Sequence, residues 1–453
     1  MIDVRCAVDL QAGKVGPEIF TDAEVYRQEQ ERIFGHTWLY VAHESQLPAP
    51  GDYLTNYLGE VAVIVVRDPA GHLRVLRNQC VHRGNKVCLF DRGQARSFTC
   101  TFHGWQYDTT GALVGVPYYE EAYRGELDRA DWGLEAVPRV ESYGGLVFAS
   151  WDPAIVPLAE YLGDLRWYLD RLLVQEHLGG MEVVGGRQRY LMPANWKLQA
   201  ENFHGDDYHV RVTHASYFQV MSQDAQSYRG KVNLDDRLQV AFGHRGGISH
   251  GLGALQVGHE SFLNERDLKT AEQLGPEAVE WVHERYRRTV EAQRDDRVKL
   301  HLFSNCNVFP NFSIVSAPGA LFSTGLLQWH PRGPMQCEVW EWAVVERDAP
   351  RIVKEHALRN LMGAQSGAGL LAPDDTENFE RSADNLRALN GRARPFHYAM
   401  AIGHDEDRDL WQKLRDRGVD VAAMPGLVGP YNWEVNQREF YRCWGELMDS
   451  ARD

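Results

Sequence analysis

The chain has 453 residues, of which 44% are hydrophobic and 25% are charged, and its formal net charge is −15. This composition is typical of globular proteins, the length is sufficient for two or three domains, and the acidic balance argues against nucleic acid as a partner. No apolar run is long enough for a transmembrane helix, and the first residues lack the pattern of a secretory signal. We therefore expect a cytoplasmic protein with neither a nucleic-acid nor a membrane partner.

The first predicted elements are a short helix and a region rich in strands. Asp22 offers an N-cap for a helix over 21–35. From about 38 to 155 the pattern favours strands, and the run 61–66 is expected to pair with 73–76 as a hairpin. A small β domain is therefore predicted in the first third of the chain.

Within this β-rich region, two clasps each supply one cysteine and one histidine. The first contains Cys80 and His82, the second contains Cys100 and His103, and each histidine is followed closely by glycine. Two thiolates and two imidazoles could bind zinc, or they could hold a Rieske [2Fe-2S] cluster in which one iron takes both cysteines and the other takes both histidines. Because each clasp supplies one ligand of each kind, and glycine lets backbone N–H groups approach an anionic sulfur core, the pattern favours the cluster.

The rest of the chain mixes helices and strands. A helix is predicted over 158–174 from its apolar stripe. The segment 242–258 holds six glycines and is a candidate for a mobile loop, of the kind that often covers a pocket; the alternative is a long surface connection. Further strands are expected at 181–192, 308–317, 319–330 and 336–346, and further helices at 276–297, 350–363, 375–389 and 434–449.

A second group of metal-capable side chains follows residue 200. Two neutral imidazoles and one carboxylate form the facial triad of non-haem Fe(II) oxygenases. His209 and His214 are five residues apart, so they can converge only if a helix bends or ends between them. The best candidate for the carboxylate is Asp375, at the start of a predicted helix, whereas Asp374 is interpreted as the N-cap of that helix.

Taken together, the two motifs resemble those of the catalytic α subunit of Rieske non-haem iron ring-hydroxylating dioxygenases. The nearest branches are those of toluene/biphenyl, phenylpropionate, naphthalene and polycyclic aromatics. The resemblance covers essentially the whole chain, including 33–39, 307–310, 329–334 and 441–446.

This resemblance implies an α+β fold with two domains. A β-rich Rieske domain, expected at 38–156, is inserted near the N-terminus of a catalytic mononuclear-iron domain formed by 1–37 and 157–453. The catalytic domain is expected to be built on an antiparallel sheet with surrounding helices.

The resemblance also assigns roles to individual residues. It implies that the four clasp residues bind the cluster and that His209, His214 and Asp375 bind the iron. It also matches Asp206 to an aspartate that, in the related enzymes, links an iron-ligand histidine to a cluster-ligand histidine of the neighbouring subunit. In the related enzymes Gln365 is replaced by an aromatic residue that often faces the substrate. The full set of candidate pocket residues is Asn202, Phe203, Val210, Phe218, Leu252, Asn307, Phe309, Gln365 and Leu371.

The implied activity is the addition of both atoms of O₂ to an aromatic ring, which gives a cis-dihydrodiol. The electrons would come from NADH through a reductase and a ferredoxin, and a small β subunit is expected in a hexamer of three α and three β subunits, with an α trimer as the alternative. Two other functions share some of these residues: a Rieske monooxygenase or O-demethylase acting on an aromatic acid, and a Rieske electron-transfer protein without oxygenase activity.

Overall fold

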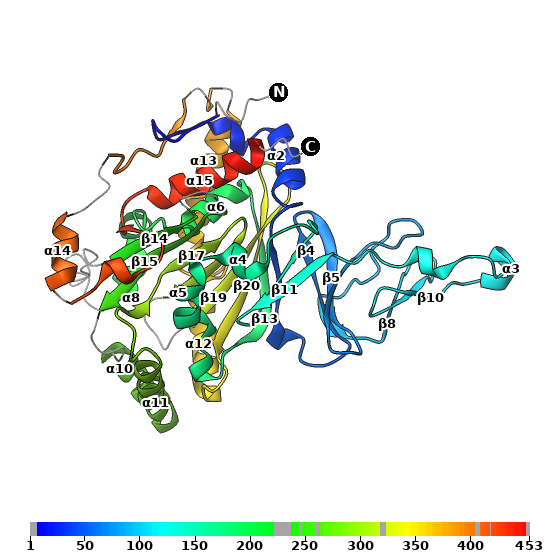
Figure 1. Cartoon of the computed structure of the whole chain (residues 1–453), viewed down its shortest axis with the longest axis horizontal. Helices are drawn as coiled ribbons and strands as arrows, with labels where there is room; N and C mark the ends of the chain where they lie inside the picture. Colours follow the sequence, from blue (N-terminus) through cyan, green and yellow to red (C-terminus); the bar gives the residue numbers. More distant parts are fainter. Residues whose placement is uncertain are drawn as a thin grey trace. The chain divides into compact units, whose positions relative to one another are not determined.

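The chain forms two compact units, one from Phe34 to Leu158 and the other from Met1–Ile33 together with Ala159–Asp453. In Figure 1 the strands of the smaller unit are blue and cyan, and most strands of the large sheet in the other unit run from green to yellow. The computed structural model describes residues 7–221, 237–243, 247–258, 263, 265–317, 323–388, 390–392, 394–403, 408–416 and 418–449.

The smaller unit consists of three small antiparallel sheets. The predicted hairpin is confirmed as β5 (Val61–Arg67) and β6 (Leu73–Arg77), in which Ile64 pairs with Leu76. These strands belong to a four-stranded sheet in the order β6-β5-β4-β7, beside three-stranded sheets in the orders β10-β9-β8 and β11-β12-β3. The remaining strands are β3 (Leu39–His43), β4 (Asp52–Leu58), β7 (Arg92–Gln94), β8 (Ser97–Thr99), β9 (Gln106–Asp108), β10 (Leu113–Gly115), β11 (Arg139–Tyr143) and β12 (Leu146–Ser150).

The two clasps lie against the core of this unit. Ile64 and Leu76 from the hairpin, Tyr107 from β9, and Cys80 and Cys100 belong to one cluster of buried side chains. Burial of apolar side chains on one face of each strand holds the loops that carry the cysteines and histidines.

The larger unit is built on a nine-stranded antiparallel sheet, which confirms the predicted α+β architecture. Its main path has the order β13-β20-β19-β18-β17-β15-β14-β22, and β16 pairs with β15. The strands are β13 (Met181–Met192), β14 (Arg237–Phe242), β15 (His250–Gly258), β16 (Lys299–Leu302), β17 (Asn305–Val308), β18 (Phe312–Ala317), β19 (Ser323–Pro331), β20 (Cys337–Glu346) and β22 (Leu427–Pro430).

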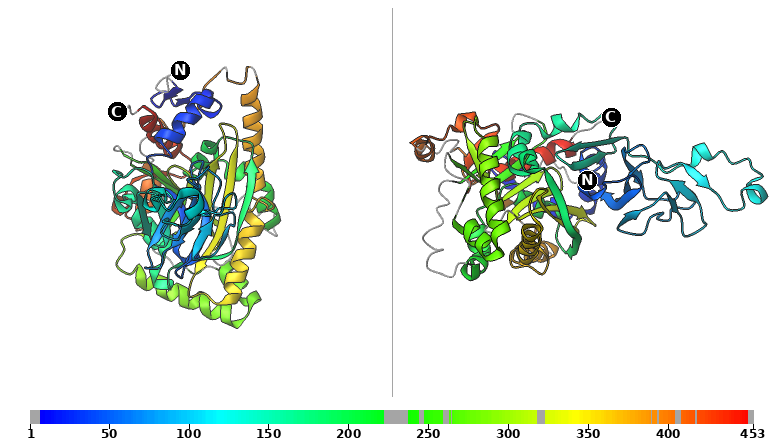
Figure 2. Two further views of the ribbon diagram at one scale, coloured as in Figure 1. Left: turned by 90° about the vertical axis from the view of Figure 1, so that its right-hand side faces the viewer. Right: turned by 90° about the horizontal axis from the view of Figure 1, so that it is seen from below.

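Helices pack on this sheet. The helix α12 lies over β18, β19 and β20, while α6 lies over β17, β18 and β19. Figure 2 shows α12 and α13 following one another along one side of the sheet. The helices named here and below are α6 (Trp196–Phe203), α7 (Val210–Thr213), α8 (Ala215–Met221), α10 (Glu265–Leu274), α11 (Pro276–Ala292), α12 (Arg351–Gln365), α13 (Ala372–Arg387), α14 (Arg408–Asp416) and α15 (Val435–Asp449).

The helix α2 (Ala23–Arg32) is held against the rest of the larger unit by a buried ion pair. Asp22 caps α2 by accepting from the backbone N–H groups of the first turn, as predicted. Further along α2, the Glu29 carboxylate accepts hydrogen bonds from the Lys197 ammonium and from the indole N–H groups of Trp196 and Trp444. One carboxylate therefore connects α2, α6 and α15.

The prediction of one helix over 158–174 is wrong. The segment contains α4 (Leu158–Leu162), α5 (Leu165–Leu169) and a π-helical turn, Asp170–Val174. Gly163 lies between the first two with a φ of +50°. A glycine in this left-handed conformation ends one helix and redirects the chain into the next.

The prediction of a mobile loop over 242–258 is also wrong. Phe242 ends β14, and the run from His250 to Gly258 is β15, a central strand of the large sheet. A Cβ atom on Gly251 would lie only 1.9 Å from the carbonyl oxygen of His204, so glycine is required here for close packing rather than for mobility. Of the strand predicted at 319–330, residues 319–322 lie outside the described residues.

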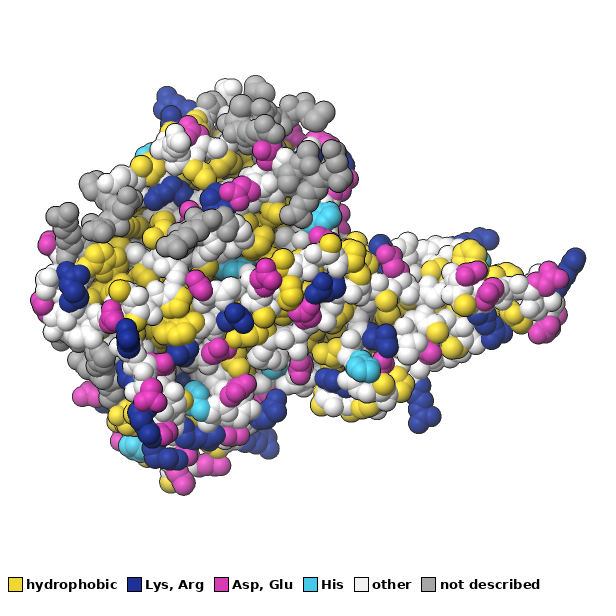
Figure 3. Space-filling view, in the orientation of Figure 1, with side chains coloured by type: hydrophobic (Ala, Val, Ile, Leu, Met, Phe, Trp, Pro, Cys, Tyr) yellow, Lys and Arg dark blue, Asp and Glu magenta, His cyan; other side chains and the backbone are white. Residues whose placement is uncertain are grey.

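None of the described helices is long and apolar enough to cross a membrane. On the face shown in Figure 3, acidic and basic side chains are interspersed rather than gathered into one basic patch.

Candidate functional site

The two clasps form a matched pair of tight loops. The backbone N–H of Gly84 donates to the carbonyl of Cys80 at 2.8 Å, and that of Gly104 donates to Cys100 at 2.9 Å. Both glycines have a positive φ, +77° and +74°, which side chains other than glycine rarely adopt. The ring centroids of His82 and His103 are 4.6 Å apart, so the loops bring the two imidazoles together.

The surroundings of these four residues suit a cluster of two irons and two sulfides. The Nδ1 atom of His82 is buried and has no hydrogen-bond partner among the described residues. Burial raises the pKa of Cys100, but hydrogen bonds from the backbone N–H groups of Phe102 and His103 and from Asn85 lower it below its usual value. A thiol that ionises readily and an imidazole nitrogen without a partner are what a metal cluster requires.

A zinc site would bring all four ligand atoms to one point. Within the described part of the chain, the only group of three or more His, Cys, Asp or Glu residues whose ligand atoms all lie within 4.8 Å of one another is His209, His214 and Asp375. The clasp residues do not converge in this way, as expected if their ligand atoms are divided between two irons.

The three residues of the second group come from two separate segments. His209 precedes α7, His214 follows it, and Asp375 lies in the first turn of α13. The Oδ1 atom of Asp375 is 3.4 Å from Nε2 of His209 and 3.3 Å from Nε2 of His214. As predicted, the two histidines converge because the helix between them is only four residues long. The set offers two imidazole nitrogens and one carboxylate to a single ion.

The other ring nitrogen of each histidine faces a carboxylate. Nδ1 of His209 is 3.4 Å from Oδ2 of Asp206, and Nδ1 of His214 is 3.4 Å from Oδ2 of Asp374. Such pairs fix the tautomer and leave Nε2 free for a metal. Burial alone would lower the pKa of His209, but Asp206 and Asp375 raise it to about 9.

The interpretation of Asp374 as an N-cap is therefore wrong. The helix α13 begins at Ala372, and the residue in the N-cap position is Leu371. Asp374 lies inside the first turn, from which its side chain reaches His214. The adjacent acids Asp374 and Asp375 were the signal in the sequence, since the second ring nitrogen of a histidine ligand often faces a carboxylate. The sequence alone does not show that the carboxylate behind His214 comes from α13.

The helix α6 positions the N-terminal side of this group. Asn195 caps α6 by accepting from the backbone N–H of Lys197, and Asn202 near the helix end lies 3.4 Å from His209. After α6, the buried ring of His204 accepts a hydrogen bond from Asn307 on β17. Gly251 on β15 allows this close approach of the chain to the sheet.

The candidate pocket residues divide into two groups. Asn202, Phe203, Asn307, Gln365 and Leu371 are buried on elements next to the histidines and Asp375. By strand alternation, Leu252 points away from the face on which neighbouring Gly251 meets His204. Phe309 instead packs on Phe440 of α15. Val210 lies on α7 between the histidines, and the side chain of Phe218 lies outside the described residues.

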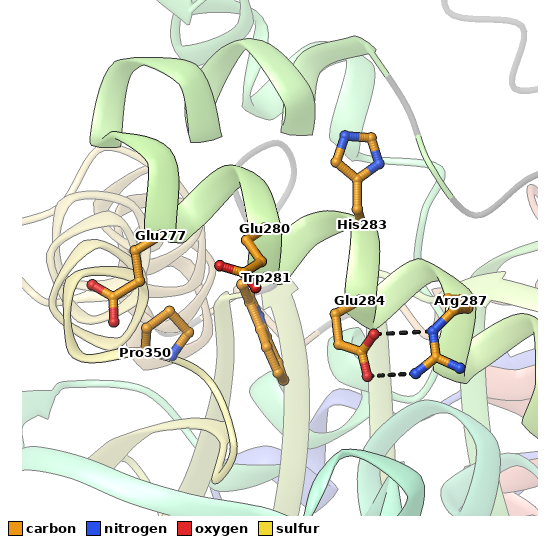
Figure 4. A pocket seen from close by; sticks show the side chains of 7 residues that line it. All are labelled: Glu277, Glu280, Trp281, His283, Glu284, Arg287 and Pro350. Atoms are coloured by element: carbon orange, nitrogen blue, oxygen red, sulfur yellow. Dashed lines mark hydrogen bonds and ion pairs between the residues drawn. The ribbon is translucent and has the colours of Figure 1, made fainter.

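A surface hollow of about 610 Å³ lies elsewhere, along α11. Figure 4 shows the Glu284–Arg287 ion pair among its lining residues. The hollow contains none of the metal-capable residues described above, so we do not associate it with their chemistry.

Comparison with known proteins identifies the family. The family model described as ring hydroxylating alpha subunit (catalytic domain) matches residues 158–450, and that of the Rieske [2Fe-2S] domain matches residues 37–140. The chain is 36% identical to the biphenyl 2,3-dioxygenase α subunit of Rhodococcus jostii (strain RHA1) over 99% of this chain and 92% of that one. It is also 36% identical to a benzene 1,2-dioxygenase α subunit of Pseudomonas putida, over 99% and 94% respectively.

A solved structure agrees with this result. A variant of naphthalene 1,2-dioxygenase bound to phenanthrene superposes with a TM-score of 0.83 and 30% identity, covering 98% of this chain and 94% of that one. The chain belongs to the ring-hydroxylating dioxygenase α subunits. It is an oxidoreductase of the Rieske type, with a [2Fe-2S] cluster and a mononuclear non-haem iron as cofactors.

Proposed function

We propose that this chain is the terminal oxygenase of a multicomponent system that converts an aromatic compound of one or more rings into a cis-dihydrodiol. The observation that carries this proposal is the convergence of His209, His214 and Asp375, with each histidine held by an outer carboxylate, in a chain that also has a Rieske unit. When bound, the mononuclear iron supplies the one-electron chemistry that activates O₂ beside the substrate.

In this proposal, His209, His214 and Asp375 hold the iron, and Cys80, His82, Cys100 and His103 hold the cluster. Asp206 and Asp374 keep the two iron-ligand imidazoles in the tautomer that presents Nε2 to the metal. The apolar residues Phe203 and Leu371, with Asn202, Asn307 and Gln365, bind the ring and exclude water.

We also propose that Asp206 links the two metal sites across a subunit interface. About a third of its side chain is exposed while it faces His209, so a second face of the carboxylate is accessible. That face would accept from His103 of the partner subunit and provide a hydrogen-bonded route for electrons. The assembly would comprise three α and three β subunits, supplied with electrons from NADH by a reductase and a ferredoxin.

The test supplies the purified oxygenase with a surrogate ferredoxin, reductase and NADH under labelled O₂. One- to four-ring aromatics and aromatic acids are screened for dihydrodiols by mass spectrometry. The expected product carries both labelled oxygen atoms on adjacent ring carbons. A product with one labelled atom, or a demethylated aromatic acid, would instead identify a monooxygenase, and an iron content accounted for by the cluster alone would identify an electron carrier.

A further inference from the structure

The large sheet buries one carboxyl group, that of Glu341, for which the described residues provide no hydrogen-bond partner. Glu341 lies in β20 between Trp340 and Trp342, and only 2% of its surface is exposed. Neither of its carboxyl oxygens has a hydrogen-bond partner among the residues that the structure describes. Such a group is costly to bury, so its presence calls for a function.

The strand register places Glu341 on the face of the sheet that carries α6. Glu341 pairs with Leu327 of β19, which pairs with Ser313 of β18, which in turn pairs with Asn307 of β17. Directly paired residues share one face of a sheet. Asn307 contacts His204 at the end of α6, so Glu341 belongs to the same face.

The side chains packed beside the carboxyl group under α12 are apolar. A Cβ atom added to Gly325 would lie 3.4 Å from Oε1 of Glu341, 3.0 Å from Val315 and 3.3 Å from Leu361 of α12. A side chain at this position would therefore crowd Glu341, and glycine is what allows the carboxyl group to pack here. Burial in these surroundings raises the pKa of Glu341 to about 8, so at neutral pH the group is mostly uncharged and can both donate and accept a hydrogen bond.

One tyrosine connects this carboxyl group to the candidate iron site. Tyr190 of β13 pairs with Val339, two residues from Glu341 on the same face. Its hydroxyl is hydrogen-bonded to Thr376, which follows Asp375 in the chain. Burial raises the pKa of Tyr190, and the nearby charges of Glu341 and Asp375 add to this effect.

The helix above the carboxyl group leads to the same pocket. Leu361 and Gln365 are four residues apart on α12 and therefore share one face of the helix. Leu361 lies beside Gly325, next to Glu341, and the buried Gln365 follows one turn later. Glu341 and Gln365 thus place hydrogen-bonding groups in an otherwise apolar region.

We propose that Glu341 lines the far end of the substrate pocket and selects aromatic substrates that carry an uncharged hydrogen-bonding substituent, a phenolic hydroxyl or an amino group. The inference rests on the proposed function and names the substrate class of the same site. A buried polar group strongly rejects an analogue that leaves it unpaired. A substrate carboxylate is disfavoured, because it would share this apolar space with a second acid.

The test compares the wild-type holoenzyme with Glu341→Leu and Glu341→Gln, and uses Glu338→Gln, on the other face of β20, as the matched control. The substrates are biphenyl, para-hydroxybiphenyl, para-aminobiphenyl and biphenyl para-carboxylate. We expect the kcat/KM ratio of hydroxybiphenyl to biphenyl to fall at least about tenfold in Glu341→Leu. Glu341→Gln, whose amide still donates and accepts, should retain most of the preference, and Glu338→Gln should be unchanged.

Equilibrium binding to the oxidised enzyme without O₂ provides a readout that does not require turnover. Hydroxybiphenyl should bind about tenfold more weakly to Glu341→Leu, and biphenyl should bind at least as tightly as before. The inference would be overturned if wild type and Glu341→Leu had the same kcat/KM ratio of hydroxybiphenyl to biphenyl and the same affinities for these two compounds. If no aromatic in the set gives a dihydrodiol, the proposed function fails, while the binding comparison still decides the role of Glu341.

Discussion

Asp374 lies behind the imidazole of His214 at the candidate iron site, with Oδ2 of the aspartate 3.4 Å from Nδ1 of the histidine. The neighbouring Asp375 approaches the Nε2 atoms of both histidines. The two adjacent acids therefore have different positions. Asp375 lies beside the Nε2 atoms that would face the metal, and Asp374 lies behind the ring of His214.

The position of Asp374 predicts a graded loss of iron. Replacing Asp374 by Ala should weaken iron binding about 10- to 100-fold, because His214 loses the partner that fixes its tautomer. Iron content after dialysis against graded concentrations of a chelator measures the effect. Asp384→Ala, at an exposed site on the same helix, is the control, and equal iron retention by both variants would contradict the role of Asp374.

Replacing Asp375 by Ala should remove all iron from the mononuclear site and none from the cluster. Asp375→Ala removes the only carboxylate near both Nε2 atoms among the described residues. Total iron should fall to the amount held by the cluster, while the visible absorption of the cluster stays unchanged. Retention of the additional iron in this variant would show that another residue supplies the third ligand.

Substitution of Asp206 tests electron transfer separately from metal binding. In Asp206→Ala, His209 keeps Asn202 as a neighbour, so both metal sites should remain loaded. Turnover should fall by about 100-fold or more, whereas reduction of the cluster by ferredoxin should proceed normally. The exposed Glu272 offers a control substitution to Ala, and wild-type turnover in Asp206→Ala would refute the proposed link between subunits.

The buried ion pair between Lys197 and Glu29 should dominate the stability of the catalytic unit near its first helix. Lys197→Met leaves the carboxylate of Glu29 buried without its cation, which costs roughly 3–5 kcal/mol. The midpoint of thermal unfolding should fall clearly. The control is Arg27→Met, which removes exposed ion pairs on the same helix and should change the unfolding midpoint little. Similar shifts of the midpoint in the two variants would show that burial of the Lys197–Glu29 pair is unimportant.

The raised pKa of Glu201 predicts that the free energy of unfolding depends on pH. Burial raises the pKa of Glu201 to about 8, above the ordinary value of 4.5. The unfolded chain therefore ionises first, and the stability that this group contributes is complete below about pH 4.5 and is lost as the pH rises towards 8. In Glu201→Gln the unfolding midpoint should decline less between pH 5.5 and 8 than in wild type, while Glu272→Gln should follow the wild type.

Local patterns predicted much of the molecule. The β5–β6 hairpin, the N-cap at Asp22 and the short spacing between His209 and His214 are all local features, and each was found as expected. The convergence of His209 with His214 also has a local origin, because α7 is too short to separate them, whereas Asp375 joins them through a tertiary contact of α13.

Tertiary contacts account for the errors and omissions. The glycines of 242–258 indicated a loop, but Gly251 is required by the His204 carbonyl packed against it, and nothing near it in the sequence indicates this contact. Asp374 was assigned to its own helix end because its partner, His214, is 160 residues away. Nothing in the sequence distinguishes Glu341 from the other two glutamates of β20, and its importance depends on neighbours from three other segments.

Gly251 and Gly253 also limit how this enzyme can change during evolution. The strand β15 meets the chain after α6 backbone to backbone, and a Cβ atom at either position would collide with His204, Asp207 or Asn305. Because His209 follows a few residues later, a side chain at either glycine position would displace the chain that leads into the iron site. New substrate preferences should therefore arise by substitutions on α12 and on β18–β20, around Gln365, Val315 and Glu341, where the pocket can change shape while the metal stays in place.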